Sequence, residues 1–253
     1  MELHLIEEPS YLEELFVIPI SDTHIGDPGF NEKELKKTLD KGSQIGGLFI
    51  LNGDLVNNAV KSSVSACYEE VIAPGDPQID YAVELLRPYR ELIIGIVSGN
   101  HERRTTREVN VNPAYRIAKE LGVRYFGDEA FIKVRFGEKK NRKPVTYTIY
   151  ATHGWGGGRT VGGKVNSMAQ CGKVVVSDIY LTAHTHQITA FNASIFVPDQ
   201  HNGNVIQMEQ WFVSSGGYLE RQGYPICKGY PPLRIGSPVI RLGGREKDIE
   251  VTL

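Results

Sequence analysis

Three short apolar segments, each ending in a polar cluster, constrain the fold of this chain most strongly. Phe16–Ile20, Leu48–Leu51 and Leu92–Val97 have the length and composition of buried strands. Helical patterns separate these strands and follow the last of them. Repetition of strand, loop and helix is typical of a parallel sheet with crossover helices.

The predicted helices have recognisable ends. They are Glu32–Asp40 behind an Asn31 cap, a helix that starts with Asp76 as N-cap and Pro77 in its first turn and stops at Pro88, and a helix from Asn112-Pro113 to Leu121. Asn31 followed by Glu34 resembles a capping box, and Gly122 is a natural stop after the last helix. These signals place one helix behind each predicted strand.

The second half of the sequence is rich in strands. The predicted strands are Phe131–Phe136, Val145–Ala151, Ile179–Ala183, Ala190–Val197 and Val205–Ser214. Asn202-Gly203 predicts a hairpin between the last two. We therefore expect an α/β protein in which a second sheet packs against the first. No linker divides the sequence, so residues 1–253 are predicted to form a single domain.

Composition restricts the cellular setting more than the chemistry. The 253 residues are 41% hydrophobic and 23% charged, which is globular rather than disordered, and the net charge of -2 argues against a protein that coats nucleic acid. The acidic N-terminus is unlike a secretory signal, and no apolar run could span a bilayer. The scattered Cys67, Cys171 and Cys227 are typical of reduced thiols. We expect a cytoplasmic protein without a membrane partner.

Polar side chains with metal-binding chemistry follow the predicted strands, where open α/β sheets place their ligands. They are Asp22, His24, Asp54, Asn100, His101, Glu102, His153, His184 and His186. Carboxylate, imidazole and amide ligands without thiolate favour Mn, Fe or Zn, and Ni fits them as well. Without His101 and Glu102 the set still exceeds the needs of one ion. It therefore predicts two divalent ions, Mn first, with a carboxylate between them.

The order of these motifs resembles that of the calcineurin-like metallophosphoesterase superfamily. The family pattern DxH, GD, GNH(D/E), H and GHxH is matched by Asp22-Thr23-His24, Gly53-Asp54, Gly99-Asn100-His101-Glu102, His153 and Ala183-His184-Thr185-His186. Only Ala183 departs from the usual glycine. The resemblance implies a four-layer α/β/β/α sandwich of two mixed sheets flanked by helices.

The resemblance also implies a role for each matched residue. One ion would be held by Asp22, His24 and His186, and the other by Asn100, His153 and His184, with Asp54 bridging them. His101 would act as the catalytic acid or as a donor to the phosphoryl group. The implied activity is hydrolysis of a phosphate ester by a hydroxide that bridges the two ions.

Substrate class depends on smaller differences. Protein phosphatases of this superfamily carry an Asp-Arg pair where this sequence has Asn57-Asn58, and nuclease-type members lack that pair. The sequence also looks like a phage- and bacterium-borne branch of phosphoesterases. We therefore expect a phosphodiesterase with a nuclease-like site, whose partner is a phosphate ester such as a nucleic acid or nucleotide. The alternative is a phosphomonoesterase for nucleotides, small phosphate esters or phosphoproteins.

Three further segments have predicted roles around the site. Arg103 and Arg104 are candidate contacts to substrate phosphate, since arginine pairs well with phosphate oxygens; a solvated helix face is the alternative. The glycine-rich stretch 154–163 predicts a mobile loop, with Trp155 near its mouth. The polar insertion 56–74 could form a rim of the pocket or an oligomer contact.

Overall fold

The structure is a computed structural model that describes residues 2–63, 67–140, 142–156, 160–199, 202–222, 226 and 229–253. Its α-helices are α1 (Glu32–Gln44), α2 (Asp76–Leu86), α3 (Asn100–Val109), α4 (Pro113–Leu121) and α5 (Val161–Gln170). Short 3₁₀ helices occupy Cys67–Glu69, Arg87–Leu92 and Cys171–Lys173. None of the helices in this described part has the length and apolar character needed to cross a bilayer.

The strands form two mixed sheets of six strands each, which we call the first and second sheets. The first sheet has the order β12-β11-β2-β3-β4-β5, with β2 (Glu14–Ile20), β3 (Leu48–Asn52), β4 (Ile93–Val97), β5 (Arg124–Gly127), β11 (Val239–Gly243) and β12 (Ile249–Thr252). The second sheet has the order β1-β6-β7-β8-β10-β9, with β1 (Leu3–Glu7), β6 (Glu129–Phe136), β7 (Val145–Thr152), β8 (Ile179–Thr182), β9 (Ile188–Asp199) and β10 (Asn204–Ser215).

Pairing within the sheets follows the predicted connections. Strands β2, β3, β4 and β5 run parallel, as strand–helix–strand crossovers require, and β11 joins β2 antiparallel. In the second sheet β6 and β7 form a hairpin, as do β9 and β10, whereas β7, β8 and β10 are parallel. The carboxyl ends of β2, β3 and β4 therefore lie at one edge of the first sheet.

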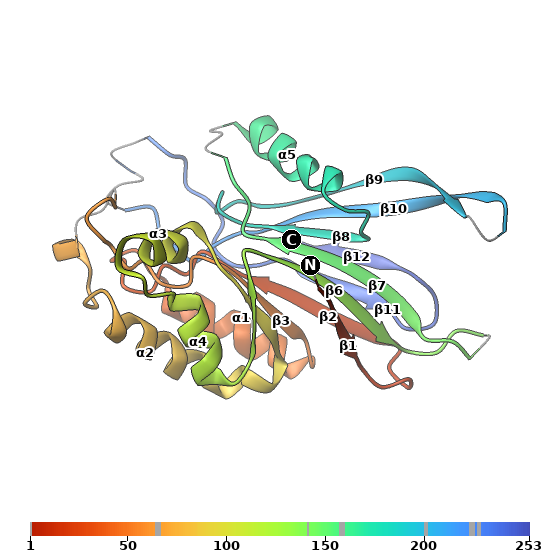
Figure 1. Ribbon diagram of the computed structural model, residues 1–253, viewed down its shortest axis with the longest axis horizontal. Coiled ribbons are helices and arrows are strands. Elements are labelled where there is room, and N and C mark those ends of the chain that lie inside the picture. The colour runs from red at the N-terminus through yellow and green to blue at the C-terminus, as the bar shows by residue number, and fades with distance from the viewer. Residues whose placement is uncertain are drawn as a thin grey trace.

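The layers are helix, sheet, sheet, helix (Figure 1). Helices α1, α2 and α4 cover the outer face of the first sheet, and α5 covers the second. Alternation along β2 shows how one strand serves two layers: Ile18 and Ile20 join the core under the helices, and Val17 joins the core between the sheets. Because both faces are buried, the central strands are apolar runs without polar alternation. The predicted four-layer α/β/β/α sandwich is confirmed.

Helix ends agree with the sequence at two places and differ at a third. Asn31 and Asn112 accept hydrogen bonds from the backbone N–H groups of Glu34 and Tyr115, at 2.9 and 3.0 Å. The N-cap of α2, however, is Gly75 and not Asp76. Gly75 has φ of 90°, a conformation that glycine adopts freely and aspartate does not, so the cap position falls to the residue before Asp76.

The α-helix ends just before Pro88, as predicted. Helix α2 stops at Leu86, and the chain continues through Pro88 as a 3₁₀ helix up to β4. Proline fits the first turn of that 3₁₀ helix, where its missing N–H has no partner to lose.

Candidate metal centre

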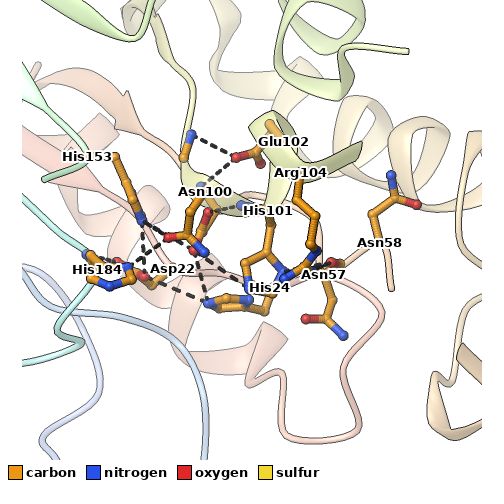
Figure 2. Close-up of polar contacts among 12 residues, drawn as sticks. Asp22, His24, Asn57, Asn58, Asn100, His101, Glu102, Arg104, His153 and His184 are labelled. Carbon is orange, nitrogen blue, oxygen red and sulfur yellow. Dashed lines mark hydrogen bonds and ion pairs between the residues drawn. The ribbon is translucent and has the colours of Figure 1, made fainter. Parts of the chain in front are cut away.

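The predicted ligands come together where strands of both sheets end (Figure 2). From the first sheet, Asp22 and His24 follow β2, Asp54 follows β3, and Asn100 opens α3 directly after β4. From the second sheet, His153 follows β7, and His184 and His186 follow β8. The site therefore lies at the shared edge of the two sheets and takes side chains from each.

One group of side chains surrounds Asp22. The Nε2 atom of His186 lies 3.2 Å from Asp22 Oδ1, and His24 Nε2 lies 3.7 Å from the same oxygen. Candidate ligand atoms of all three residues lie within 4.8 Å of one another. The other Asp22 oxygen accepts from the Ser21 hydroxyl and from the His184 backbone N–H, which restricts rotation of the carboxylate.

A second group consists of Asp54, His153 and His184, whose candidate ligand atoms also lie within 4.8 Å of one another. His153 Nε2 is 3.2 Å from Asp54 Oδ2. The side-chain oxygen of Asn100 lies 3.1 Å from His153 Nε2 and 2.7 Å from His184 Nδ1. An amide oxygen between two imidazoles completes a mixed oxygen and nitrogen donor set.

Asp54 connects the two groups. Its Oδ2 atom faces His153 Nε2 at 3.2 Å, His24 Nε2 at 3.9 Å and His101 Nε2 at 3.9 Å. His153 Nε2 is in turn 4.0 Å from Asp22 Oδ1 in the first group. A single carboxylate oxygen is thus positioned between imidazoles of both groups.

Five residues of the site have the left-handed backbone conformation, which residues other than glycine rarely adopt. Positive φ angles occur at Asp22 (49°), His24 (45°), Asp54 (50°), His184 (66°) and His186 (54°). Such left-handed conformations cost free energy and persist where the surrounding structure enforces them. Close packing adds to this, because a Cβ atom on Gly99 would lie 2.1 Å from Asp54 Oδ1. The surrounding structure therefore holds the backbone in this conformation, and the backbone in turn fixes the positions of the ligand side chains.

Buried polar atoms show that the donor set fits divalent cations. Asp22 Oδ1 and both ring nitrogens of His24 are buried without a hydrogen-bond partner among the described residues. Leaving such atoms unpaired is costly unless something binds them. Carboxylate oxygens, imidazole nitrogens and an amide oxygen, with no thiolate, match Mn, Fe or Zn chemistry. The residues present therefore fit bound metal ions.

The charges within the centre are strongly linked. Burial disfavours a charged imidazole at His153, but the carboxylates of Asp54 and Asp22 outweigh it and raise the pKa of His153 to about 10. Burial likewise opposes ionisation of Asp54, and the surrounding imidazoles overcome it, holding the pKa of this carboxyl well below its usual range. The carboxylates around His153 therefore favour its protonated form in the metal-free protein.

His101 lies beside these groups and is held from two sides. Its backbone N–H donates to Asp54 Oδ1 at 2.8 Å, and its ring Nδ1 is 2.7 Å from the Asn57 carbonyl oxygen. The guanidinium of Arg104 approaches the same Nδ1 at 3.0 Å. Burial lowers the pKa of the His101 ring to about 3. The ring is therefore neutral in the metal-free protein, with Nε2 facing Asp54.

The two arginines that follow His101 point to different places. Arg104 reaches back along α3 to His101 and to the carbonyl of Asn57 (Figure 2). Arg103 is largely exposed and pairs loosely with Asp128 at 3.9 Å. The structure brings Arg104 to the centre and leaves Arg103 at the surface, and contact of either with substrate stays a prediction.

Sequence reasoning assigned no role to Glu102, which supports the centre through hydrogen bonds to the backbone. Its carboxylate is fully buried and accepts hydrogen bonds from the backbone N–H groups of Gly99, Asp54 and Leu55, at 2.8, 2.9 and 2.7 Å. It thereby ties the turn after β3 to the start of α3. Its position in the Gly-Asn-His-Glu motif was the signal that could have found it. The Asn52 carbonyl, 2.8 Å from His153 Nδ1, has no such signal.

The glycine-rich stretch 154–163 is only partly described. Trp155 is about half exposed at 48%, and residues 157–159, which include Arg159, lie outside the described residues. A loop through Gly163 was wrong, because α5 begins at Val161 with Thr160 as its cap. Lys164 on this helix donates to the Thr185 carbonyl at 3.2 Å, between the two histidines of the last motif.

Cys171, the cysteine whose side chain the structure describes, lies outside the two ligand groups. Cys171 is a buried free thiol under α5. Burial raises the pKa of this thiol to about 11, which keeps it protonated. The side chain of Cys67 and the whole of Cys227 lie outside the described residues.

A four-layer sandwich with clustered aspartates and histidines at the strand ends defines the class of metallophosphoesterases. The family model of the calcineurin-like phosphoesterases matches residues 20–213, which include every predicted ligand. The chain belongs to this family. No curated protein matches it.

Several solved structures have a similar chain path at low sequence identity. A predicted phosphoesterase from Streptococcus pneumoniae is 12% identical with a TM-score of 0.42, over 95% of this chain and 88% of that one. A single mutant of Vps29 from Entamoeba histolytica is 14% identical with a TM-score of 0.45, over 94% and 90%. A metallophosphoesterase from Sphaerobacter thermophilus is 12% identical with a TM-score of 0.36, over 90% and 83%.

Proposed function

We propose that this protein is a phosphodiesterase with two divalent metal ions and a nuclease-like site. The observation that carries the proposal is the place of Asp54 Oδ2, between His24 at 3.9 Å and His153 at 3.2 Å. A carboxylate shared in this way suits a bridge between two cations. One ion would be held by Asp22, His24 and His186, and the other by Asn100, His153 and His184, with Mn²⁺ first among the candidates.

Two bound ions would supply Lewis-acid activation of the phosphoryl group and a nucleophilic water of lowered pKa. The protein's own contribution is to hold the ligands and to exclude other partners from them. Asp22, Asp54 and His153 are each at most 1% exposed, so bulk water does not compete for their lone pairs. Glu102 fixes the backbone at Asp54, and the Asn52 carbonyl fixes the His153 ring, so the ligands keep their directions.

His101 would serve the leaving oxygen. Nδ1 lies 2.7 Å from the Asn57 carbonyl oxygen, which only accepts, and 3.0 Å from the Arg104 guanidinium, which only donates. We place the hydrogen of Nδ1 on the shorter contact, to Asn57, which leaves Nε2 facing the centre. An anionic phosphate in the site raises the pKa of the ring again, since an opposite charge favours the protonated form. The charged ring can then donate a proton from Nε2 as the ester bond breaks.

The surroundings of His101 support a diester substrate. The ring contacts the neutral carbonyl of Asn57 and the guanidinium of Arg104, and Asn58 has no charge to offer a second phosphate oxygen. A diester carries one negative charge fewer than a monoester dianion and needs fewer cationic contacts. A segment of nucleic acid or a nucleotide diester is therefore the favoured substrate class.

The test compares bis-p-nitrophenyl phosphate with p-nitrophenyl phosphate, with Mn²⁺ added and with EDTA as control. We expect faster hydrolysis of the diester and loss of both activities in EDTA. A preference for the monoester would make the protein a phosphomonoesterase, and activity that survives EDTA would contradict the metal requirement. Single-stranded DNA and cyclic nucleotides are the next substrates.

A further inference from the structure

The insertion that follows Asp54 is folded back on itself by one carboxylate. Glu70, near the end of the insertion, accepts hydrogen bonds from the Asn57 side-chain amide at 2.7 Å and from the Ala59 backbone N–H at 2.8 Å, both through Oε1. Its other oxygen accepts from the side-chain amide of Gln78 at 2.7 Å. Two donors come from the start of the insertion and one from α2.

We call the hydrogen bonds that Glu70 accepts the Glu70 clasp. Gln78 has one possible amide orientation in this clasp. It is fully buried, and its Oε1 atom accepts from the Asn58 backbone N–H at 2.8 Å, while its amide donates to Glu70 and to the Ile72 carbonyl. Gly26 packs against it so tightly that a Cβ atom there would lie 2.1 Å from the Gln78 amide nitrogen. Turning the amide over would place its oxygen against Glu70 and the Ile72 carbonyl and would break the bond to Asn58.

Asn58 is anchored from its other side as well. It has φ of 44°, and its side chain accepts from the Gly75 N–H at 2.6 Å and donates to the Thr105 hydroxyl at 3.0 Å. The peptide between Asn57 and Asn58 is thus held at both ends. Its carbonyl oxygen is the group that lies 2.7 Å from His101 Nδ1.

We infer that Glu70 is a positioning residue for His101. Its carboxylate fixes the Asn57–Asn58 peptide, and the carbonyl of that peptide sets the direction in which His101 Nε2 faces the reacting ester. The insertion then contributes to catalysis although none of its described residues belongs to a ligand group. This inference rests on the proposed function, because it assigns Glu70 to the proton transfer that His101 performs there.

Glu70→Gln is the sharpest variant. It keeps the size of the side chain, but its amide group meets the amide of Gln78, donor against donor, and Gln78 cannot flip to accept without losing its bond to Asn58. Glu69→Gln is the matched control, since Glu69 is the same residue type one position earlier and is exposed. Asn57→Ala tests the clasp from its other side, because it removes the amide donor and keeps the backbone carbonyl.

The readout is dependence on the leaving group. A p-nitrophenolate leaves without a proton, whereas the sugar alkoxide of a dinucleotide needs one. We expect Glu70→Gln and Asn57→Ala to lower kcat on a thymidine dinucleotide about tenfold, a fraction of what general acid catalysis supplies. Both variants should change hydrolysis of bis-p-nitrophenyl phosphate less than about twofold, since no proton transfer is lost there. Glu69→Gln should match the wild type on both.

A double variant separates positioning from general loss of structure. In a His101→Ala background, Glu70→Gln should have no further effect on the dinucleotide, because the residue it orients is gone. An additive loss, or an equal loss on both esters, would overturn the inference. If the wild type hydrolyses only monoesters, the same comparison runs with p-nitrophenyl phosphate and glycerol phosphate, so the fate of Glu70 is decided separately from that of the diesterase proposal.

A spectroscopic measurement on the metal-free protein gives an answer independent of turnover. Nitrogen-15 NMR of the histidine rings should show a protonated Nδ1 at His101 with slow hydrogen exchange in the wild type and in Glu69→Gln. Glu70→Gln should show faster exchange or a mixture of tautomers. An unchanged His101 signal in a folded Glu70→Gln protein would also overturn the inference.

Discussion

The ring of His101 is held through Nδ1 by the carbonyl oxygen of Asn57, at 2.7 Å, while its Nε2 atom faces Asp54 Oδ2 at 3.9 Å. The direction of Nε2 is therefore set by a contact on the opposite side of the ring. Candidate ligand atoms of His101, His24 and Asp54 lie within 4.8 Å of one another, so His101 borders the centre directly.

Replacing His101 by alanine should lower the rate of hydrolysis and leave the metal content unchanged. We expect kcat on an alkyl-leaving diester to fall on the order of 10²-fold or more, the usual contribution of a general acid. Metal content measured by inductively coupled plasma mass spectrometry should equal that of the wild type. His4→Ala, at a histidine that packs on Phe126 away from the site, is the control. Undiminished turnover in a metal-loaded His101→Ala protein would contradict the catalytic assignment.

Asp54→Asn should affect metal content first. An amide offers one neutral oxygen where the carboxylate offers a charged one to both groups, so the bridge is lost. We expect the metal content to fall below that of the wild type, with activity lost alongside it. Asp80→Asn, at an exposed position on α2, should leave metal content unchanged. Retention of both metals by Asp54→Asn would show that the carboxylate is no bridge.

Glu102→Gln should weaken the centre without touching a ligand. The glutamine can no longer accept from all three backbone N–H groups at Gly99, Asp54 and Leu55. Supporting groups of this kind typically account for about 10–100-fold in metal affinity or activity. We also expect a loss of about 1–3 kcal/mol in the free energy of unfolding, from the buried donors left unpaired. Calorimetric Mn²⁺ titration and urea denaturation measure the two effects, and wild-type values in both would refute the support role.

Metal binding should release protons at neutral pH. In the metal-free protein the Asp54 and Asp22 carboxylates raise the pKa of His153 to about 10 against the opposing effect of burial, so its ring is charged at pH 7. It must lose that proton to bind a cation, and apparent metal affinity should therefore rise with pH up to that range. Titrating Mn²⁺ in buffers of different ionisation enthalpy counts the protons released. A titration with no net release would show that His153 is neutral before metal binds.

A hydrogen bond between the two sheets, away from the site, allows a test of fold stability. The hydroxyl of Tyr147 on β7 donates to the Gly243 carbonyl at 2.7 Å and accepts from the Asp248 N–H at 2.9 Å, joining the second sheet to the β11–β12 turn of the first. Tyr147→Phe should lower the free energy of unfolding by about 1–3 kcal/mol, since two backbone groups lose their partner. Tyr150→Phe loses hydrogen bonds to the side chains of Glu129 and Thr152 and serves as the control. Equal stability of the two variants would contradict this account.

Sequence predicted the core of the fold because buried parallel strands leave a plain signal. Apolar runs such as Leu48–Leu51, with caps at Asn31 and Asn112, mark strand and helix without help from the rest of the chain. Edge strands leave a weaker signal in the sequence. The half-exposed strand β1 has mixed composition and β5 only four residues, so neither was predicted. The edge strand β12 also has only four residues. Strand β11 lies between β12 and β2, and Arg241 interrupts its apolar residues, so no apolar run marks it.

Helix α5 was not predicted, for a different physical reason. Its first turn contains Gly162 and Gly163, which disfavour a helix when isolated, and packing of Met168 on the second sheet overrides that preference. Within the site, side chains were predictable and backbone groups were not. The carbonyls of Asn52 and Asn57 act through their direction, which depends on tertiary structure and has no residue-type signature.

The ligands are shared between the two sheets, and this has a consequence for the unfolding of the whole chain. Asp22, His24 and Asp54 belong to one sheet, and His153, His184 and His186 to the other, so bound cations would act as a non-covalent clamp across the interface between them. Each of the two groups takes donors from both sheets. Metal at a hundred times its dissociation constant would stabilise the folded chain by about 2.7 kcal/mol, and that stabilisation would oppose separation of the sheets as one cooperative event.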